Sequence, residues 1–94
     1  MPFWVYILEC SDGSYYVGIA SDLPARLARH QSGRGCAFTA ARRPVRLVFA
    51  ERHSTEPEAA GRERQLKGWS RAKKAALLAG KVAEVHRLSA RRRR

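Results

Sequence analysis

Two tyrosines, an arginine and a histidine near the start of the chain have the types and spacing that a chemical site requires. Tyr6 lies within the tripeptide Val-Tyr-Ile, and Tyr16 opens the tripeptide Tyr-Val-Gly further along. Arg26 and His30 stand four residues apart, which places them on one side of a helix. A phenol, a guanidinium and an imidazole are poor material for an apolar core, but together they can bind a phosphate and move a proton. We therefore expect a site that handles a phosphate, with Glu63 as its carboxylate.

Each of these residues also has a simpler structural interpretation. Tyr6 and Tyr16 can be ordinary aromatic residues of a sheet, with their hydroxyls at its rim. Arg26 can lie on the solvated face of a helix. Lys67 follows Glu63 by four residues, so an i,i+4 ion pair is the default for this carboxylate. Residue by residue, these simpler interpretations are favoured, and only the joint pattern, taken with the family resemblance described below, favours a functional site.

A β-hairpin is the element that must bring the two tyrosines together. Residues 3–9 are rich in aromatic and β-branched side chains, and a second strand over 15–20 follows a turn at 11–14 that contains Asp and Gly. Alternate side chains of a strand share a face. If even-numbered residues pair with even-numbered residues, Tyr6 and Tyr16 lie on one face, whereas a slip of one residue separates them.

Helices and one more strand follow the hairpin. The first predicted helix runs from the N-cap Asp22 to about Ser32, and a basic glycine-containing loop over 33–43 follows it. A third strand is predicted from Pro44 to Glu51. Two more helices are predicted, one from the capping box at Thr55 to about Gly68 and a short basic one over about 70–79. The order β-β-α-β-α-α predicts a small α+β domain with one three-stranded sheet.

The chain is strongly basic. Its 94 residues include 19 Lys and Arg against 8 Asp and Glu, which gives a net charge of +11. We expect one domain over residues 1–80 and a basic, flexible, solvated tail over residues 81–94, and both parts carry a net positive charge. Such a field favours polyanions, of which nucleic acid is the most common. A ribosome-associated scaffold, an acidic membrane surface and a genome that uses Arg in place of Lys are the alternatives.

The remaining composition excludes several classes of protein. Cys10 and Cys36 are too few to crosslink a secreted domain or to build a structural zinc site, so we expect free thiols in a reducing cytoplasm. The sequence has no apolar run long enough to span a membrane and no secretory signal pattern at its start. The prediction is a soluble, cytoplasmic protein. His53 and His86 are expected to be structural or surface residues.

The ordered motifs resemble a known family. The set Val-Tyr-Ile, Tyr-Val-Gly, Asp22-Leu23 and Arg26, with these spacings, resembles the GIY-YIG nuclease domain, and in particular the short stand-alone bacterial YhbQ-like proteins. The Arg-Arg-Pro run at 42–44 and the run at 62–67 extend the resemblance over about residues 3–78. It implies a three-stranded antiparallel sheet flanked by helices, and metal-dependent hydrolysis of phosphodiester bonds in DNA, in repair or recombination.

The resemblance also implies a role for each candidate residue. Tyr16 resembles the general base or the group that orients the attacking water, and Tyr6 resembles the group that positions them. Arg26 corresponds to a ligand of the scissile phosphate, and His30 to a residue that assists proton transfer. Glu63 resembles the single protein ligand of one divalent ion, Mg²⁺ or Mn²⁺. The predicted contacts to the nucleic-acid backbone are Arg42, Arg43, Lys67, Arg71, Lys73 and Lys74.

Three functional hypotheses follow. The first is a structure-selective or nonspecific, metal-dependent DNA endonuclease, acting on branched or damaged DNA, alone or with a protein partner. The second is a nucleic-acid-binding protein on the same scaffold with weak or no catalytic activity. The chain lacks asparagine, which some members of the superfamily use near the site, and Ile19 stands where some carry lysine. The third is a basic RNA- or ribosome-associated protein, which the absence of an RNA-binding motif disfavours.

Overall fold

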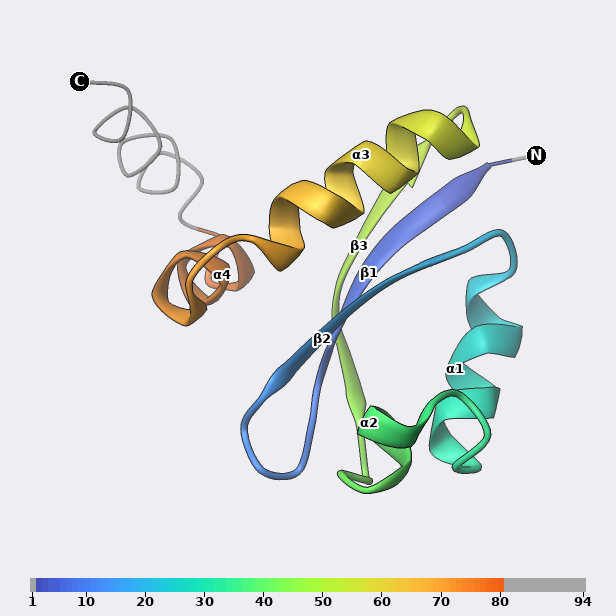
Figure 1. Ribbon diagram of the computed structural model, residues 1–94, viewed down its shortest axis with the longest axis vertical. Coiled ribbons are helices and arrows are strands. Elements are labelled where there is room, and N and C mark those ends of the chain that lie inside the picture. The colour runs from blue at the N-terminus through green and yellow to red at the C-terminus, as the bar shows by residue number, and fades with distance from the viewer. Residues whose placement is uncertain (1, 81–94) are drawn as a thin grey trace.

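A three-stranded antiparallel sheet forms the centre of the molecule (Figure 1). The computed structural model describes residues 2–80, and its strands are β1 (Phe3–Glu9), β2 (Tyr15–Ala20) and β3 (Arg46–His53). The strand order is β2-β1-β3, so β2 is an edge strand. The predicted α+β class and the three-stranded antiparallel sheet are confirmed. The predicted tail over residues 81–94, which contains His86, lies outside the described residues.

The register of the β1–β2 hairpin places the two tyrosines on one face. Tyr6 pairs with Gly18, and Leu8 pairs with Tyr16, so the structure adopts the alternative in which even-numbered residues oppose even-numbered residues. The turn between the strands depends on Gly13, whose φ of +83° is a left-handed conformation that suits glycine. Asp12 stabilises the same turn by accepting a hydrogen bond of 3.0 Å from the backbone N–H of Ser14.

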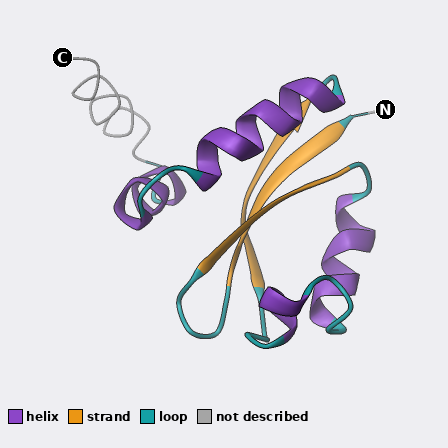
Figure 2. Ribbon diagram, viewed as in Figure 1, coloured by secondary structure: helices purple, strands orange, loops and turns teal. Residues whose placement is uncertain are grey.

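Helices cover both faces of the sheet (Figures 1 and 2). On one face, α3 (Glu56–Lys67) and α4 (Arg71–Leu78) complete an apolar cluster. Its buried members are Val5, Ile7, Val17, Ala59, Leu66 and Trp69. On the other face, α1 (Leu23–Gln31) completes a second cluster. Its members are Tyr6, Leu8, Cys10, Ala20 and Val45, with Tyr16, Leu23 and Leu27 packed against them. The predicted catalytic tyrosines therefore belong to the α1 side of the sheet.

The predicted helix starts are confirmed by their caps. The side chains of Asp22, Thr55 and Ser70 accept hydrogen bonds from the backbone N–H groups three residues further along. These caps set where α1, α3 and α4 begin, and so which faces of those helices meet the sheet. No helix within residues 2–80 has the length and apolar character needed to cross a membrane.

The structure corrects two predictions between residues 33 and 53. The third strand begins at Arg46 rather than Pro44 and ends at His53 rather than Glu51. Pro44 has no N–H to donate, and both backbone groups of Val45 bind the Gln31 side chain, so neither residue joins the ladder. The predicted loop over 33–43 contains a one-turn helix, α2 (Ala37–Ala40), which is too short to show a helical periodicity in the sequence.

We predict that Gly18→Ala destabilises the protein, because a Cβ atom at this position would lie 2.5 Å from Cζ and Oη of Tyr6. The expected loss is about 1–3 kcal/mol in the free energy of unfolding, measured by urea denaturation. Gly61→Ala is the matched control, since a Cβ atom there meets nothing within 4 Å and α3 should gain about 0.5–1 kcal/mol. Equal effects of the two substitutions would contradict this account.

Candidate active site

The Tyr6 hydroxyl is the buried centre of the candidate site. Tyr6 has no exposed surface, and its hydroxyl lies 2.9 Å from Nε2 of His30, which is itself buried. Gly18 opposes Tyr6 across the hairpin, and the absence of a side chain there leaves room for the ring. Burial raises the pKa of Tyr6, and a hydrogen bond from Arg26 opposes this rise. Tyr6 therefore remains a phenol and does not face solvent.

The hydrogen-bond partners fix the direction of each proton around His30. Thr39 donates to the backbone carbonyl of Cys36 at 3.4 Å, so its Oγ1 accepts a proton from Nδ1 of His30 at 2.8 Å. Nε2 of the neutral ring then has no proton and accepts that of the Tyr6 hydroxyl at 2.9 Å. The result is one directed chain of hydrogen bonds from β1 through α1 to α2.

Thr39, Gly35 and Cys36 belong to this network but were not among the predicted site residues. Thr39 is fully buried, and a Cβ atom at Gly35 would lie 2.2 Å from Nδ1 of His30. Gly35 thus permits a close approach of the α1–α2 connection to the imidazole. The Gly-Arg-Gly run at 33–35 was the available sequence signal, whereas no pattern marked Thr39, because α2 spans a single turn.

Tyr16 is the more accessible of the two tyrosines and lies beside Tyr6. Its ring centroid is 6.3 Å from that of Tyr6 and 5.2 Å from that of His30. Burial, together with the nearby Tyr6, Cys36 and Glu63, raises the pKa of Tyr16 to about 12. Burial alone would also raise the pKa of the Cys36 thiol, but hydrogen bonds with Thr39 and Tyr16 outweigh it and lower the pKa.

Arg26 joins α1 to the edge strand. Its Nη1 donates to the backbone carbonyl of Ile19 at 3.2 Å, and the side chain is half-buried. Burial and, after it, the charges of Arg26 and Arg29 lower the pKa of His30, which keeps the imidazole neutral. Arg26 therefore holds a positive charge at β2 while its neighbour His30 remains uncharged.

Glu63 approaches the tyrosines from the opposite side of the sheet. It shares the inward stripe of α3 with Ala59 and Leu66, which lie four residues before it and three after it. Its charge contributes to raising the pKa of both Tyr6 and Tyr16. The expected ion pair with Lys67 is present, with 3.4 Å between Nζ and Oε2.

Glu63 is also the candidate metal ligand. Residues 2–80 contain no group of three or more His, Cys, Asp or Glu side chains that could hold a metal ion. Residues 2–80 therefore do not form a metal site in which the protein supplies three or more such ligands. A single, partly exposed carboxylate fits Mg²⁺ or Mn²⁺, because Mg²⁺ in particular keeps several waters and often has only one or two protein ligands.

Six side chains were predicted to contact the nucleic-acid backbone, and four of them contact other parts of the protein instead. Arg42 binds Asp12 at 3.0 Å, Arg43 donates to the carbonyls of Ala40 and Gln31, and Arg71 donates to the carbonyl of Gly13. Lys73 is buried, with its ammonium 4.4 Å from the centroid of the Trp69 ring. These contacts brace the loops around the sheet and leave Lys73 little surface to offer a ligand.

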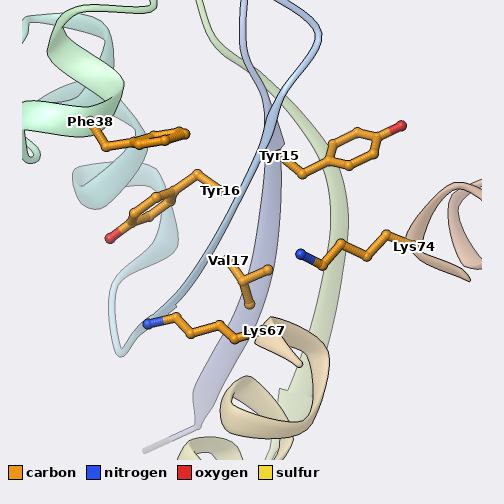
Figure 3. A pocket seen from close by; sticks show the side chains of 6 residues that line it. All are labelled: Tyr15, Tyr16, Val17, Phe38, Lys67 and Lys74. Atoms are coloured by element: carbon orange, nitrogen blue, oxygen red, sulfur yellow. The ribbon is translucent and has the colours of Figure 1, made fainter. Parts of the chain in front are cut away.

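The other two, Lys67 and Lys74, line a pocket beside β2 (Figure 3). The pocket has a volume of about 240 Å³ and reaches Tyr16. The structure thus brings Tyr6, Tyr16, Arg26 and His30 together, and places Glu63 and two lysines on the other side of the same edge strand.

Comparisons with known proteins identify the family of this chain and its fold. The protein-family model of the GIY-YIG catalytic domain matches residues 2–76 of this chain. UPF0213 proteins from several strains of Staphylococcus aureus are 47% identical over 75 residues, which is 80% of this chain and 92% of each relative. The solution NMR structure of a UPF0213 protein from Bacillus halodurans has a TM-score of 0.57 and 42% identity over 86% of both chains. That of a protein from E. faecalis has a TM-score of 0.61 and 34% identity over 88% of both chains.

We predict that Thr39→Val destabilises the protein by about 1–3 kcal/mol, because it leaves the buried Nδ1–H of His30 without an acceptor. Thr39→Ser retains the hydroxyl and should keep most of this stability. Urea denaturation measures the loss, and ¹⁵N NMR of the imidazole reports which nitrogen is protonated. Spectra of the unmodified protein with the proton on Nε2 would refute the assigned hydrogen-bond directions.

The lowered pKa of His30 predicts that stability falls as the pH falls. The unfolded chain binds a proton near pH 6.5, whereas the folded protein resists this protonation until a lower pH. The contribution of His30 is therefore complete above about pH 6.5 and is lost below it, by at most about 1.4 kcal/mol per pH unit. Urea denaturation between pH 7 and pH 5 should therefore show a shallower dependence of the free energy of unfolding on pH for His30→Gln than for the unmodified protein.

Proposed function

The chain belongs to the GIY-YIG catalytic domain family, and from this premise we propose that it is a divalent-metal-dependent endonuclease that hydrolyses phosphodiester bonds in DNA. Membership of the family supports a nuclease acting on a nucleic acid. The UPF0213 names of its relatives state neither a substrate nor a reaction. The choice of DNA, the metal ion and the residue roles are therefore argued from the site itself.

The convergence of Tyr16, Arg26 and Glu63 on β2 carries the proposal. Tyr16 is part of this strand, Arg26 donates to its Ile19 carbonyl, and the charge of Glu63 influences the pKa of Tyr16. The three groups come from β2, α1 and α3, which meet because β2 is an edge strand that both faces of the sheet can reach. A hydroxyl, a guanidinium and a carboxylate around one position are the groups that phosphodiester hydrolysis needs.

Arg26 is assigned to the scissile phosphate. The transition state of phosphodiester hydrolysis gains negative charge on the phosphate oxygens, and a guanidinium stabilises that charge in a two-pronged geometry. Arg26 has five N–H donors, of which one serves Ile19 and another serves Tyr6. The remaining donors are sufficient for two phosphate oxygens while the side chain stays fixed at the strand.

Tyr16 is assigned to the attacking water. With a pKa of about 12 it keeps its proton at neutral pH, so it can orient the water but removes a proton poorly. The rate of cleavage should accordingly rise with pH as the fraction of phenolate grows. Tyr6 and His30 are buried and use their polar atoms on one another and on Arg26 and Thr39. We therefore assign them to positioning Arg26 and Tyr16 rather than to direct contact with the substrate.

Glu63 is assigned to the divalent ion. The Glu63 carboxylate would hold Mg²⁺ or Mn²⁺, since both ions prefer oxygen ligands. When bound, such an ion supplies electrostatic stabilisation of the departing oxygen. Lys67, which pairs with Glu63 and lines the wall of the pocket, would compete with a cation for this carboxylate.

A second candidate function is nucleic-acid binding on the same scaffold without cleavage. The observation in its favour is the pKa of Tyr16, which at about 12 leaves almost no phenolate at neutral pH. The net charge of +11 supports binding to a polyanion in either case. We assign the selectivity of this domain to the shape of DNA or to a protein partner, and its role to DNA repair or recombination in the cytoplasm.

Cleavage assays with Glu63→Gln test the proposed function. We expect the unmodified protein to cut labelled DNA with Mn²⁺ or Mg²⁺ and to stop in EDTA. The cleavage rate of Glu63→Gln should be at least about 100-fold lower than that of the unmodified protein, because the substitution removes the negative charge of the proposed metal ligand. The substrates are single-stranded, duplex, flapped and branched DNA of matched sequence, with RNA for comparison.

Glu58→Gln is the matched control, since this exposed carboxylate lies in the first turn of the same helix. It should retain the rate of the unmodified protein. Binding of DNA without cleavage in either metal ion would favour the second candidate function. Cleavage that survives both EDTA and Glu63→Gln would exclude the proposed metal role.

A further inference from the structure

The pocket beside β2 contains groups that the proposed cleavage chemistry does not use (Figure 3). Of its lining residues, only Tyr16 has a part in the proposed reaction. The lining comes from β2, α2, α3 and α4 and consists of Tyr15, Tyr16, Val17, Phe38, Lys67 and Lys74. Three aromatic rings and two ammonium groups therefore share one pocket of about 240 Å³.

The aromatic wall is exposed and contacts neighbouring side chains. Phe38 is one of two large apolar side chains in the described chain that are exposed, at 38%. Its ring stacks near that of Tyr16, with centroids 6.1 Å apart and planes 30° apart. The Arg42 guanidinium lies 4.0 Å from the same ring and is itself held by Asp12. An exposed apolar ring with such neighbours is typical of a binding surface.

The opposite wall carries positive charge. Figure 3 shows Lys67 and Lys74 reaching toward β2 from α3 and α4, on the other side from Phe38. Burial lowers the pKa of Lys74, so its ammonium has lost part of its hydration, and an anion near it would be favourable. Lys67 lies beside Glu63, which connects this wall to the candidate metal ligand.

The two walls together fit an unpaired nucleotide better than a base pair. Bases in a duplex are stacked on one another and offer only their edges in the grooves, so an aromatic wall gains little from them. An unpaired base can leave the stack and place its flat face on an aromatic ring, while the adjoining phosphates meet lysines. The pocket reaches Tyr16, which places such a nucleotide next to the proposed point of cleavage.

We propose that this pocket binds an unpaired nucleotide of the DNA substrate, with its base against the Phe38 side and its phosphates at Lys67 and Lys74. The proposal rests on the proposed function for the assignment of DNA, and it narrows the substrate to DNA with a single-stranded segment, such as a flap, a bulge or a free strand. Phe38 then determines the structure of the DNA that is bound rather than its sequence.

Binding in EDTA tests the pocket separately from cleavage. Fluorescence anisotropy compares a labelled single strand with a blunt duplex of the same length at equal salt. We expect tighter binding of the single strand, and an approximately tenfold loss of that affinity in Phe38→Ala, the size expected for one lost stacking contact. Phe38→Trp should retain the affinity, because it restores an aromatic face. Lys74→Met should reduce the slope of log affinity against log salt by about 0.7.

Leu47→Ala is the matched control, since Leu47 is also 38% exposed but lies on β3, the opposite edge of the sheet. It should leave the affinity for both DNAs unchanged. Thermal unfolding of each variant confirms that it is folded.

Equal binding of single strand and duplex, unaffected by Phe38→Ala, would overturn the pocket proposal even if Glu63-dependent cleavage is observed. Binding of single strands that is weakened by Phe38→Ala, without any cleavage by the unmodified protein, would support the proposed nucleotide pocket and refute the proposed endonuclease function. An RNA strand that binds more tightly than the DNA strand of the same sequence would overturn the assignment of DNA.

Discussion

The buried hydrogen bond between Tyr6 and His30 is the interaction on which the candidate site depends. Both side chains are almost completely removed from solvent, so each polar atom requires a partner inside the protein. Arg26 and Thr39 supply those partners, and Gly18 and Gly35 supply the space. The requirement to satisfy two buried polar groups therefore joins β1, α1 and α2 in one arrangement.

The position of β2 at the edge of the sheet determines which groups can meet. In a central strand, neighbouring strands would separate side chains of one face from those of the other. At the edge, Arg26 from the α1 side and the charge of Glu63 from the α3 side both reach the strand that carries Tyr16. The pocket follows the same geometry, since Phe38 comes from α2 on one side of β2 and Lys67 and Lys74 come from α3 and α4 on the other.

The sequence was sufficient for the three strands and the three longer helices, because these depend on local signals, but it left the register of the hairpin open and missed α2. Asp22 and Thr55 capped their helices as expected, and the observed register selected the alternative in which Tyr6 and Tyr16 share a face. The start of β3 depended on Gln31, a side chain fourteen residues away, which no local pattern contains. Thr39 was missed for the same reason, since its importance comes from a contact with His30 across a loop.

The basic and aromatic rim of β2 also affects how the protein meets other copies of itself. An exposed edge strand presents unpaired backbone groups, and these can extend a sheet from one molecule into the next. Lys67 and Lys74 place like charges beside this edge, and Phe38 adds bulk on its other side. Two such edges would repel one another on approach. The residues that make the strand accessible to a polyanion thus make it unfavourable for fibril-like association.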